Sequence, residues 1–290
     1  MVLDCGGRPL DLGRVVVMGI LNITPDSFSD GGVFFARDKA AARAREMVEQ
    51  GAAIIDIGGE STRPGAQAVS EQEELDRVLP VIEALHATVP VVLSIDTSKP
   101  AVMRAAVAAG AGLINDVMAL RANGALRAVV ELKVPVCLMH MQGEPRSMQS
   151  NPQYTDVVAE VRQFLAGRRK VCVDAGIPHE HILLDPGFGF GKTLAHNCAL
   201  LRDLHRLRDL GSPLLVGLSR KSMIGKALGL PVEQRLHASL ALAALAVQNG
   251  ASIVRTHDVA ATRDAIRMTE VVLTSDAHQL QQTVDTQEAG

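Results

Sequence analysis

The chain has 290 residues, of which 47% are hydrophobic and 21% charged, and this is typical of a globular protein and not of a disordered one. The net charge of -3 gives no basic surface that would attract nucleic acid, and an aromatic content of 2% without Trp gives few rings on which bases could stack. These values argue against a nucleic-acid-binding protein. The four Cys residues form no CxxC pair, the first residues lack the order of a signal peptide, and no apolar run approaches the ~20 residues of a membrane span, so we expect a cytoplasmic protein.

Eight short apolar runs recur along the chain, and each leads to polar residues. The runs are rich in Val, Ile and Leu and do not alternate with polar residues, which indicates strands buried on both faces, as in a parallel sheet. In chain order the polar ends are Asn22, Glu60 with Thr62, Asp96, Asn115, His140, Asp185, Ser219 with Arg220 and Lys221, and Arg255 with His257.

Helix-like stretches separate these runs, as parallel neighbouring strands require. The sequence predicts helices over residues 37–50, 70–87, 99–109, 123–132, 155–175, 195–210, 233–249 and 260–275. Ser70, followed three residues later by Glu73, predicts a capping box at the start of the second helix. Eight strand–helix units predict one α/β domain over residues 1–275, a single (β/α)8 TIM barrel with an N-terminal extension, followed by a polar tail over 276–290. Such barrels carry their chemistry at the C-terminal strand ends.

Two of the connections after strands are long and polar, and we expect them to act as active-site lids. They read NITPDSFSDGGVFF after the first strand and GESTRPGAQAV after the second. Phe28, Phe34 and Phe35 are half of the six Phe residues and suggest a flap that closes over a flat ligand. Docking of these rings on the barrel rim is the alternative interpretation.

Asp96 and Asp185 end apolar strands, where an ionised carboxylate is costly to bury without a partner. Two acids that face one cavity can bind the NH groups of a heterocycle or serve as acid and base. Asn115 adds a donor and an acceptor at a neighbouring strand end. A structural salt bridge across the barrel mouth is the alternative interpretation.

A cationic set accompanies these acids. Arg forks match phosphate oxygens, and phosphate in such barrels often binds after the seventh and eighth strands, where SRKS and RTH lie. The set therefore predicts a phosphate or diphosphate site, against the alternative of solvated surface cations. Its members are Arg63, Arg220, Lys221, Arg255 and His257.

Several motifs do not support other functions. The run DPGFGFGK over residues 185–192 lacks the spacing of a P-loop or a dinucleotide fingerprint, and its glycines suggest close approach of the backbone to a ligand. His140 could act as a base, but a lone His flanked by Met is more often structural. No carboxylate cluster predicts a permanent metal, although Asn22 and a diphosphate could share a Mg2+.

The segments GILNITPDSFSDGG, DIGGESTRPGA, SIDTSKP, INDV, CLMHMQG, LLDPGFGFGK, LVGLSRKSMIG and VRTHDV together resemble the bacterial dihydropteroate synthases, pterin-binding TIM-barrel enzymes of folate biosynthesis. The resemblance extends from about Val15 to Val272 and includes all eight strand ends in order, which makes it specific. It implies a transferase that condenses 6-hydroxymethyl-7,8-dihydropterin diphosphate with 4-aminobenzoate to give 7,8-dihydropteroate and pyrophosphate. It also implies inhibition by sulfonamides and a homodimer.

The resemblance assigns roles by matching motif. It implies that the pterin is bound by Asp96, Asn115, Met139, Asp185, Lys221 and Arg255. It implies that the diphosphate is bound by Asn22, Arg63, Arg255 and His257, with Asn22 as a ligand of Mg2+. It implies that 4-aminobenzoate is bound by Phe28, Thr62, Pro64, Phe190, Ser219 and Lys221. The catalytic residues among these would be Asp96, Lys221, Arg63, Arg255 and His257.

Residues and resemblance suggest the same mechanism. Cations and Mg2+ stabilise the departing diphosphate, and the amine then attacks a pterin-stabilised methylene cation in an SN1-like route.

One rival function is that of a Schiff-base aldolase that uses Lys221, with the neighbouring Arg220 lowering the pKa of this lysine. The others are a corrinoid-dependent methyltransferase, from which the TRPG and SRKS loops should be absent, and a non-catalytic pterin-binding paralogue.

Overall fold

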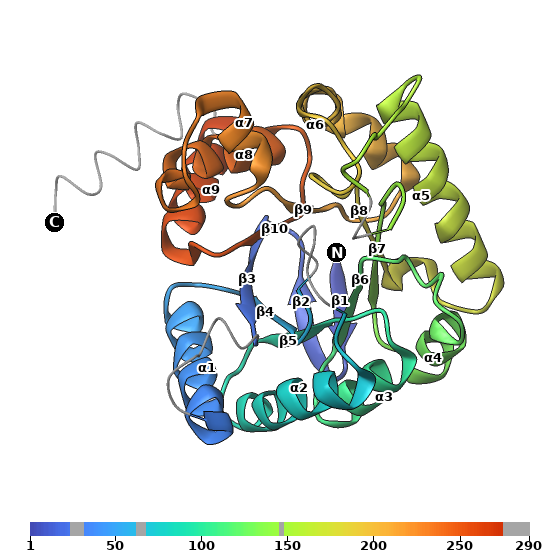
Figure 1. Cartoon of the computed structure of the whole chain (residues 1–290), viewed down its shortest axis with the longest axis vertical. Coiled ribbons are helices and arrows are strands. Elements are labelled where there is room, and N and C mark those ends of the chain that lie inside the picture. The colour runs from blue at the N-terminus through green and yellow to red at the C-terminus, as the bar shows by residue number, and fades with distance from the viewer. Residues whose placement is uncertain (24–31, 62–67, 145–147, 275–290) are drawn as a thin grey trace, which may run out of the picture.

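Eight parallel strands form a barrel, and helices surround it on the outside (Figure 1). The computed structural model describes residues 1–23, 32–61, 68–144 and 148–274. The barrel strands are β3 (Val16–Asn22), β4 (Ile54–Gly58), β5 (Val92–Asp96), β6 (Leu113–Asp116), β7 (Val136–Met139), β8 (Ile182–Asp185), β9 (Leu215–Gly217) and β10 (Ile253–Thr256). The helices are α1 (Gly32–Glu49), α2 (Glu71–His86), α3 (Pro100–Ala108), α4 (Ala125–Leu132), α5 (Val157–Asp174), α6 (Leu194–Arg202), α7 (Ser222–Leu228), α8 (Leu236–Gln248) and α9 (Val259–Thr274).

The strands follow one another around the ring in chain order. Each strand from β3 to β7 pairs with the next, and a parallel bridge between Leu184 and Leu214 joins β8 to the segment that leads into β9. β10 pairs with β9 on one side and with β3 on the other, which closes the ring. Helices cover the outer face, so β4, for example, is buried along its whole length, as its unbroken apolar run predicts. The predicted (β/α)8 barrel is therefore confirmed.

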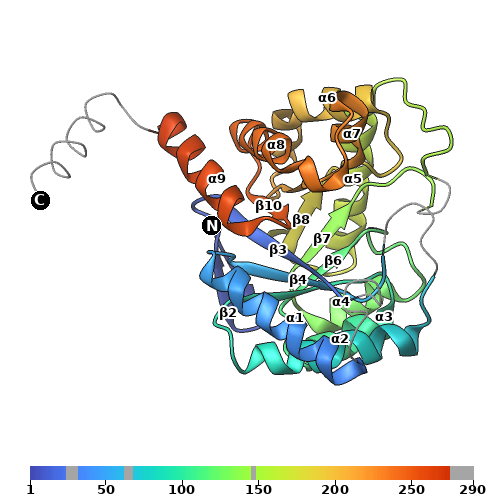
Figure 2. The same cartoon turned by 60° about the vertical axis from the view of Figure 1, so that its left-hand side comes forward.

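The predicted N-terminal extension is an antiparallel hairpin of β1 (Val2–Cys5) and β2 (Arg8–Asp11), and it covers one end of the barrel. Leu3, Cys5 and Leu10 are buried against side chains from the beginnings of barrel strands, such as Met18 and Ile54. Figure 2 shows the hairpin and the N-terminus together at this end. Because apolar side chains fill the N-terminal end, the polar chemistry is left to the C-terminal ends of the strands.

Three local features differ from the predicted helices. α1 begins at Gly32, so residues 34 and 35 lie in a helix and not in the connection after the first strand. The helix predicted over 195–210 is α-helical only to Arg202 and continues as a 3-10 helix over Leu204–Leu210. α7 has only seven residues, which is too short for an apolar period to reveal. The tail predicted over 276–290 lies outside the described residues.

The capping box predicted at the start of α2 is half formed. The Ser70 hydroxyl accepts a hydrogen bond from the Glu73 N–H at 3.2 Å, as predicted. The Glu73 carboxylate does not return to the Ser70 backbone and pairs instead with Arg77, one turn further along the same face of the helix.

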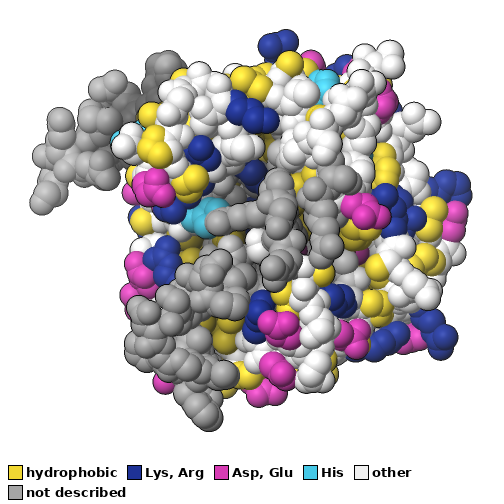
Figure 3. All heavy atoms as spheres, viewed as in Figure 1, with side chains coloured by type: hydrophobic (Ala, Val, Ile, Leu, Met, Phe, Trp, Pro, Cys, Tyr) yellow, Lys and Arg dark blue, Asp and Glu magenta, His cyan; other side chains and the backbone are white. Residues whose placement is uncertain are grey.

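Acidic and basic side chains are interspersed over the face of the molecule drawn in Figure 3, so no field of one sign dominates it. This distribution agrees with the small net charge. None of the helices in the described part of the chain combines the length and the apolar character that a membrane crossing needs.

Replacing Leu3 by Ala tests how much the hairpin stabilises the barrel. Leu3 is 1% exposed, so the substitution leaves a cavity and should lower the free energy of unfolding by about 3 kcal/mol, as measured by urea denaturation. Val2→Ala is the matched control, because Val2 is 63% exposed and its truncation should cost under about 0.5 kcal/mol. Equal losses in the two variants would show that the hairpin does not contribute through its buried face.

Candidate active site

The strand register brings polar side chains together at the C-terminal end of the barrel. Every second side chain of a strand points to the same face. Asp96 at the end of β5 lies level with Asn115 on β6, and Met139 on β7 lies level with Asp185 on β8. The pterin-binding residues predicted from four separate segments are thus neighbours in the folded barrel.

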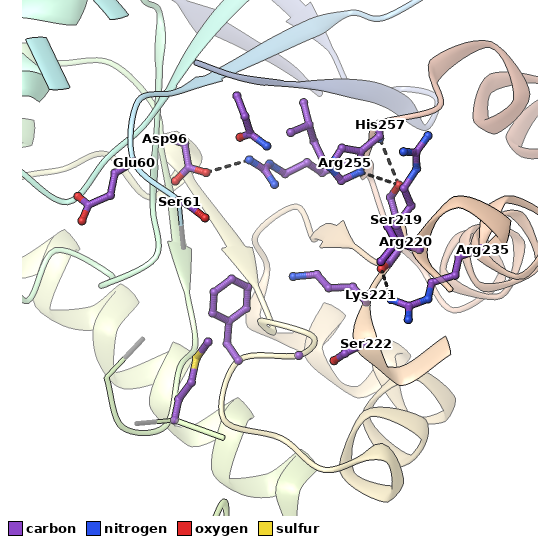
Figure 4. Close-up of a pocket in the computed structure, with 16 residues that line it drawn as sticks. Glu60, Ser61, Asp96, Ser219, Arg220, Lys221, Ser222, Arg235, Arg255 and His257 are labelled. Carbon is purple, nitrogen blue, oxygen red and sulfur yellow. Dashed lines mark hydrogen bonds and ion pairs between the residues drawn. The ribbon is translucent and has the colours of Figure 1, made fainter. Parts of the chain in front are cut away.

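Two cavities adjoin at this end, with volumes of about 370 and about 20 Å³. Both are lined by Asp96, Phe190, Lys221 and Arg255, which therefore separate them. Polar residues that line only the larger cavity are Asn22, Glu60, Ser61, Ser219, Arg220, Ser222, Arg235 and His257 (Figure 4). The smaller cavity is completed by Asn115, Val117, Met139, Asp185, Phe188 and Gly217.

Arg255 is the charged centre of the site. Its Nε lies 2.6 Å from an Asp56 carboxylate oxygen, and its Nη2 lies 2.8 Å from Asp96, to which it reaches across the larger cavity in Figure 4. The Asn115 amide donates to the same Asp56 oxygen at 3.1 Å. The salt bridge considered as an alternative for Asp96 is therefore present, and it lies in the cavity itself. A buried guanidinium between two carboxylates holds all three groups in place.

Burial and neighbouring charges shift the pKa values in this cluster. Burial raises the pKa of Asp96 to about 7, with Arg255 opposing the rise and Asp56 adding to it. Burial also raises the pKa of Asp185, although the Gly187 N–H, which donates to this carboxylate at 2.7 Å, opposes it. Ionisable groups shifted by burial and by specific partners within one cavity are typical of functional sites.

Lys221 extends into the cavity from the beginning of α7. Burial lowers the pKa of Lys221 to about 8, and Asp185 opposes this change. The sequence predicted that Arg220 would lower the pKa of Lys221. Arg220 instead pairs with Asp258, with its Nε 3.0 Å from the carboxylate, and Arg255 is the cation that adds to the lowering of the pKa of Lys221. The Lys221 ammonium lies 4.3 Å from the centre of the Phe190 ring, within the range of a cation–π contact.

His257 and Ser219 complete the cationic side of the site. The Ser219 hydroxyl lies 3.0 Å from His257 Nδ1 and accepts from the His257 backbone N–H at 3.2 Å. Arg220 holds a left-handed backbone conformation with φ of 56°. Its carbonyl accepts from Arg235 at 3.1 Å, so the segment that presents Ser219 and Lys221 is fixed from behind.

The structure brings together most of the predicted site residues. Asn22, Asp96, Asn115, Met139, Asp185, Phe190, Ser219, Lys221, Arg255 and His257 all line one or both cavities. Phe28, Thr62, Arg63 and Pro64 lie outside the described residues, as do most of the first predicted lid and the centre of the second.

Asp56 is the main residue that the sequence reasoning missed. It is fully buried in the middle of β4 and bonds both Arg255 and Asn115. A sign of its role was available, because an acid inside an otherwise apolar strand needs a buried partner.

The glycine-rich run after β8 packs against the end of β7, and Gly189 also lines the larger cavity, so close approach of this backbone to a ligand stays a prediction. Gly187, Gly189 and Gly191 all have positive φ, between 61° and 81°, which side chains rarely adopt. A Cβ on Gly187 would lie 1.9 Å from the His140 carbonyl oxygen. These glycines therefore allow the loop to turn tightly against the end of β7. His140 lines neither cavity, which supports its structural interpretation.

The sequence profile of a family described as "Pterin binding enzyme" matches residues 18–257. The chain is 53% identical to the dihydropteroate synthase of Haemophilus influenzae over 92% of its own length and 98% of that protein. It is 51% identical to the dihydropteroate synthase of Escherichia coli, over 95% of this chain and 98% of the relative.

Solved structures are similar over the same extent. A Xanthomonas albilineans dihydropteroate synthase with 4-aminobenzoic acid is 55% identical, with a TM-score of 0.90 over 95% of this chain and 99% of that one. A Yersinia pestis dihydropteroate synthase in a sulfonamide drug complex is 52% identical, with a TM-score of 0.91 over 95% and 100%. The X. albilineans enzyme in complex with 7,8-dihydropteroate is 52% identical, with a TM-score of 0.87 over 95% and 100%.

Replacing Arg255 by Met tests its place between two buried acids. Loss of the cation should lower the free energy of unfolding by about 3 kcal/mol at pH 8.5, because it leaves buried carboxylates without a counter-charge. The folded-state pKa of Asp96 is raised to about 7, so this carboxyl group is neutral well below pH 7 and needs no cation there.

The loss should therefore shrink as the pH falls from 8.5 to 5.5, as measured by urea denaturation at both values. Arg104→Met is the control, because the pair between Arg104 and Glu131 is exposed and should contribute under about 1 kcal/mol. A loss independent of pH would contradict the assigned role of Arg255.

Proposed function

Because the chain belongs to the family of pterin-binding enzymes, we propose that it condenses 6-hydroxymethyl-7,8-dihydropterin diphosphate with 4-aminobenzoate to give 7,8-dihydropteroate and pyrophosphate. This is the transferase activity of a dihydropteroate synthase in folate biosynthesis, the name that its relatives carry at about 50% identity over nearly their whole length. The observation that carries the proposal is the pair of adjoining cavities. The smaller one is lined by acids and an amide, the larger one mainly by cations and hydroxyl groups together with Glu60 and Asn22, and Lys221 and Arg255 lie between them.

The lining of the smaller cavity matches the hydrogen-bonding groups of the pterin ring, although its volume of about 20 Å³ requires side chains to move before the ring can enter. Carboxylates accept from NH groups, and an amide can both donate and accept, so Asp96, Asp185 and Asn115 match the NH-rich edge of this heterocycle. Met139 lines the same cavity and offers a polarisable side chain to a ring face. The ring would fit once the side chains that line the cavity adjust to it.

The cationic side of the wall suits the diphosphate. Asp56 and Asp96 bond the Nε and Nη2 atoms of Arg255, and no other described residue bonds its Nη1, so that nitrogen can donate to a phosphate oxygen. His257 on the same strand end lines the larger cavity and would add a second donor when protonated. Together these groups stabilise charge on the leaving group.

The larger cavity suits 4-aminobenzoate, which the X. albilineans relative contains in its structure. Phe190 provides an aromatic wall, and Ser219 and Lys221 provide donors for the carboxylate group. Because this cavity shares Phe190 and Lys221 with the smaller one, an amine bound here can face the methylene carbon of the pterin.

We propose that the diphosphate departs before the amine attacks. The C–O bond breaks with its electron pair on the diphosphate, and a methylene cation remains that the pterin ring stabilises. The Asp96 carboxylate, which is ionised above about pH 7, would stabilise this cation by its negative charge. The amine nitrogen then forms the C–N bond and loses a proton, so no covalent enzyme intermediate forms.

Mg2+ belongs to this proposal as a partner of the substrate. The described residues contain no group of three or more His, Cys, Asp or Glu side chains that suits a resident metal. Mg2+ commonly takes one or two protein ligands together with phosphate oxygens, and Asn22 at the cavity edge fits that arrangement. When bound, the ion would neutralise charge on the diphosphate.

The cellular setting follows from the proposed activity. We propose a cytoplasmic enzyme, since its substrates are small charged molecules that are made and used inside cells. A homodimer is proposed by analogy with the family, and sulfonamides are proposed as inhibitors because the Y. pestis relative is solved in a sulfonamide drug complex.

Product analysis tests this function. The purified chain, given both substrates and Mg2+, should form 7,8-dihydropteroate that chromatography detects. Asp185→Asn should lower kcat/KM by about 10- to 100-fold, because it replaces a charged acceptor of pterin NH groups by a neutral one. Asp174→Asn, on the exposed side of α5, is the control and should leave turnover unchanged. Absence of product would contradict the function, and an unaffected Asp185→Asn variant would contradict the site.

A further inference from the structure

Lys192 is a buried lysine that the proposed mechanism does not use. It ends the glycine-rich loop after β8 and is only 1% exposed. Its Nζ lies 2.9 Å from His140 Nδ1, 2.9 Å from the Gly187 carbonyl oxygen and 3.0 Å from the Phe190 carbonyl oxygen. Three acceptors at hydrogen-bonding distance match the three N–H groups of an ammonium ion.

None of these acceptors carries a charge, and no carboxylate among the described residues bonds this ammonium. Burial lowers the pKa of Lys192 to about 7, which reflects the cost of holding a cation here. A Leu or Met side chain would fill the same space without that cost. The lysine must therefore contribute something that apolar packing cannot, and its hydrogen bonds to the loop backbone are the evident candidate.

His140 is placed so that its ring can accept a hydrogen bond from Lys192. It is 5% exposed, and its ring meets Phe164 edge to face with the ring centres 4.9 Å apart. Burial, together with Lys192, lowers the pKa of His140 to about 3, so the ring is neutral at ordinary pH. Because Lys192 donates to Nδ1, the single ring proton lies on Nε2. A neutral His at the end of β7 thus anchors the lysine to the barrel.

The loop is held by several contacts, of which those of Lys192 are one set. Phe188 is 1% exposed in the core, and the Tyr154 hydroxyl donates to the Gly191 carbonyl at 2.9 Å. The glycines at 187, 189 and 191 have positive φ and give the chain the freedom to adopt many other conformations. Lys192 bonds the carbonyl groups at both ends of the 187–190 stretch and connects them to β7 through His140. Outside this cluster, the Gly189 N–H donates to Asn197 at 2.8 Å, and the Gly189 carbonyl accepts from the Gln149 side-chain amide.

The loop carries Phe190, which lines both cavities and lies 4.3 Å from the Lys221 ammonium. One of the two loop carbonyl groups that Lys192 bonds is that of Phe190 itself. We propose that Lys192, anchored on His140, is a positioning residue that holds the Phe190 ring in place as the wall of the amine pocket. The inference rests on the proposed function, because it names the amine as the ligand affected.

In this proposal the strand residues bind the pterin, and the loop, through Phe190, binds the amine. Asp96, Asn115 and Asp185 belong to strands, whose backbone ladder should hold them when the loop is perturbed. Of the three, Asp185 also accepts a hydrogen bond from the loop, from the Gly187 N–H. Phe190 depends on the loop for its position. Loss of Lys192 should therefore weaken binding of the amine much more than binding of the pterin.

The experiment compares Lys192→Met, Phe190→Ala and the double variant with the wild-type chain. The amine KM should rise about tenfold or more in Lys192→Met and comparably in Phe190→Ala, while the pterin Kd changes by less than about threefold. The double variant should have the amine KM of Phe190→Ala alone, because the lysine acts through that ring. Lys170→Met on the exposed face of α5 is the matched control and should leave every value unchanged.

A role in stability alone would give a different pattern. If Lys192 only stabilised the fold, Lys192→Met would have a lower melting temperature and an unchanged amine KM. If Lys192 acted on the amine KM independently of Phe190, its effect would multiply that of Phe190→Ala in the double variant. Either result would overturn the proposal. If Lys192→Met does not fold, His140→Phe decides, because it removes one of the three acceptors. It should raise the amine KM about two- to fourfold in the wild-type background and not at all in Phe190→Ala.

Failure of this inference is distinct from failure of the proposed function. A wild-type chain that forms no dihydropteroate contradicts the function. A wild-type chain that turns over, together with a folded Lys192→Met variant that keeps its amine KM, contradicts only the positioning role.

Discussion

The buried ion pairs of Arg255 with Asp56 and Asp96 are the interaction on which the site depends. The barrel places the fully buried Asp56 on β4 and the largely buried Asp96 at the end of β5, and Arg255 reaches both carboxylates from β10. The cost of burying them is offset because each acid shares the cation. The ion pairs that hold the site together therefore also orient Arg255. Its Nη1 bonds none of the described residues, and we propose a phosphate oxygen as its acceptor.

Much of this architecture could be predicted from the sequence, because its signals are local. Unbroken apolar runs identify the barrel strands, and the polar residue at each end identifies the site. Contacts that join distant segments were not visible in this way. Asp56 pairs with a residue 199 positions away, and Lys192 bonds His140 across 52 positions, so neither partnership has a spacing in the chain to reveal it. The sequence indicates the glycines after β8, but it does not predict their left-handed conformation or their packing against the end of β7.

Rigid and adjustable parts of the site have different physical origins. The acids and the amide that suit the pterin lie at strand ends, fixed by the ladder of backbone hydrogen bonds. Phe190 lies on a glycine-rich loop, where the backbone has little intrinsic preference and the hydrogen bonds of a buried lysine add to the contacts that restrain it. A binding site with one fixed half and one tethered half can hold a reactive pterin firmly while the second substrate enters and the product leaves.

We propose that the barrel mouth promotes departure of the diphosphate and that the amine attacks afterwards. Pyrophosphate release from the dihydropterin diphosphate, measured with Mg2+ in the presence and absence of 4-aminobenzoate, tests this order most directly. We expect release in both cases, with dihydropteroate formed only when the amine is present. Release that requires the amine would contradict the dissociative order and favour direct displacement, and tight pterin binding without any release would contradict catalysis itself.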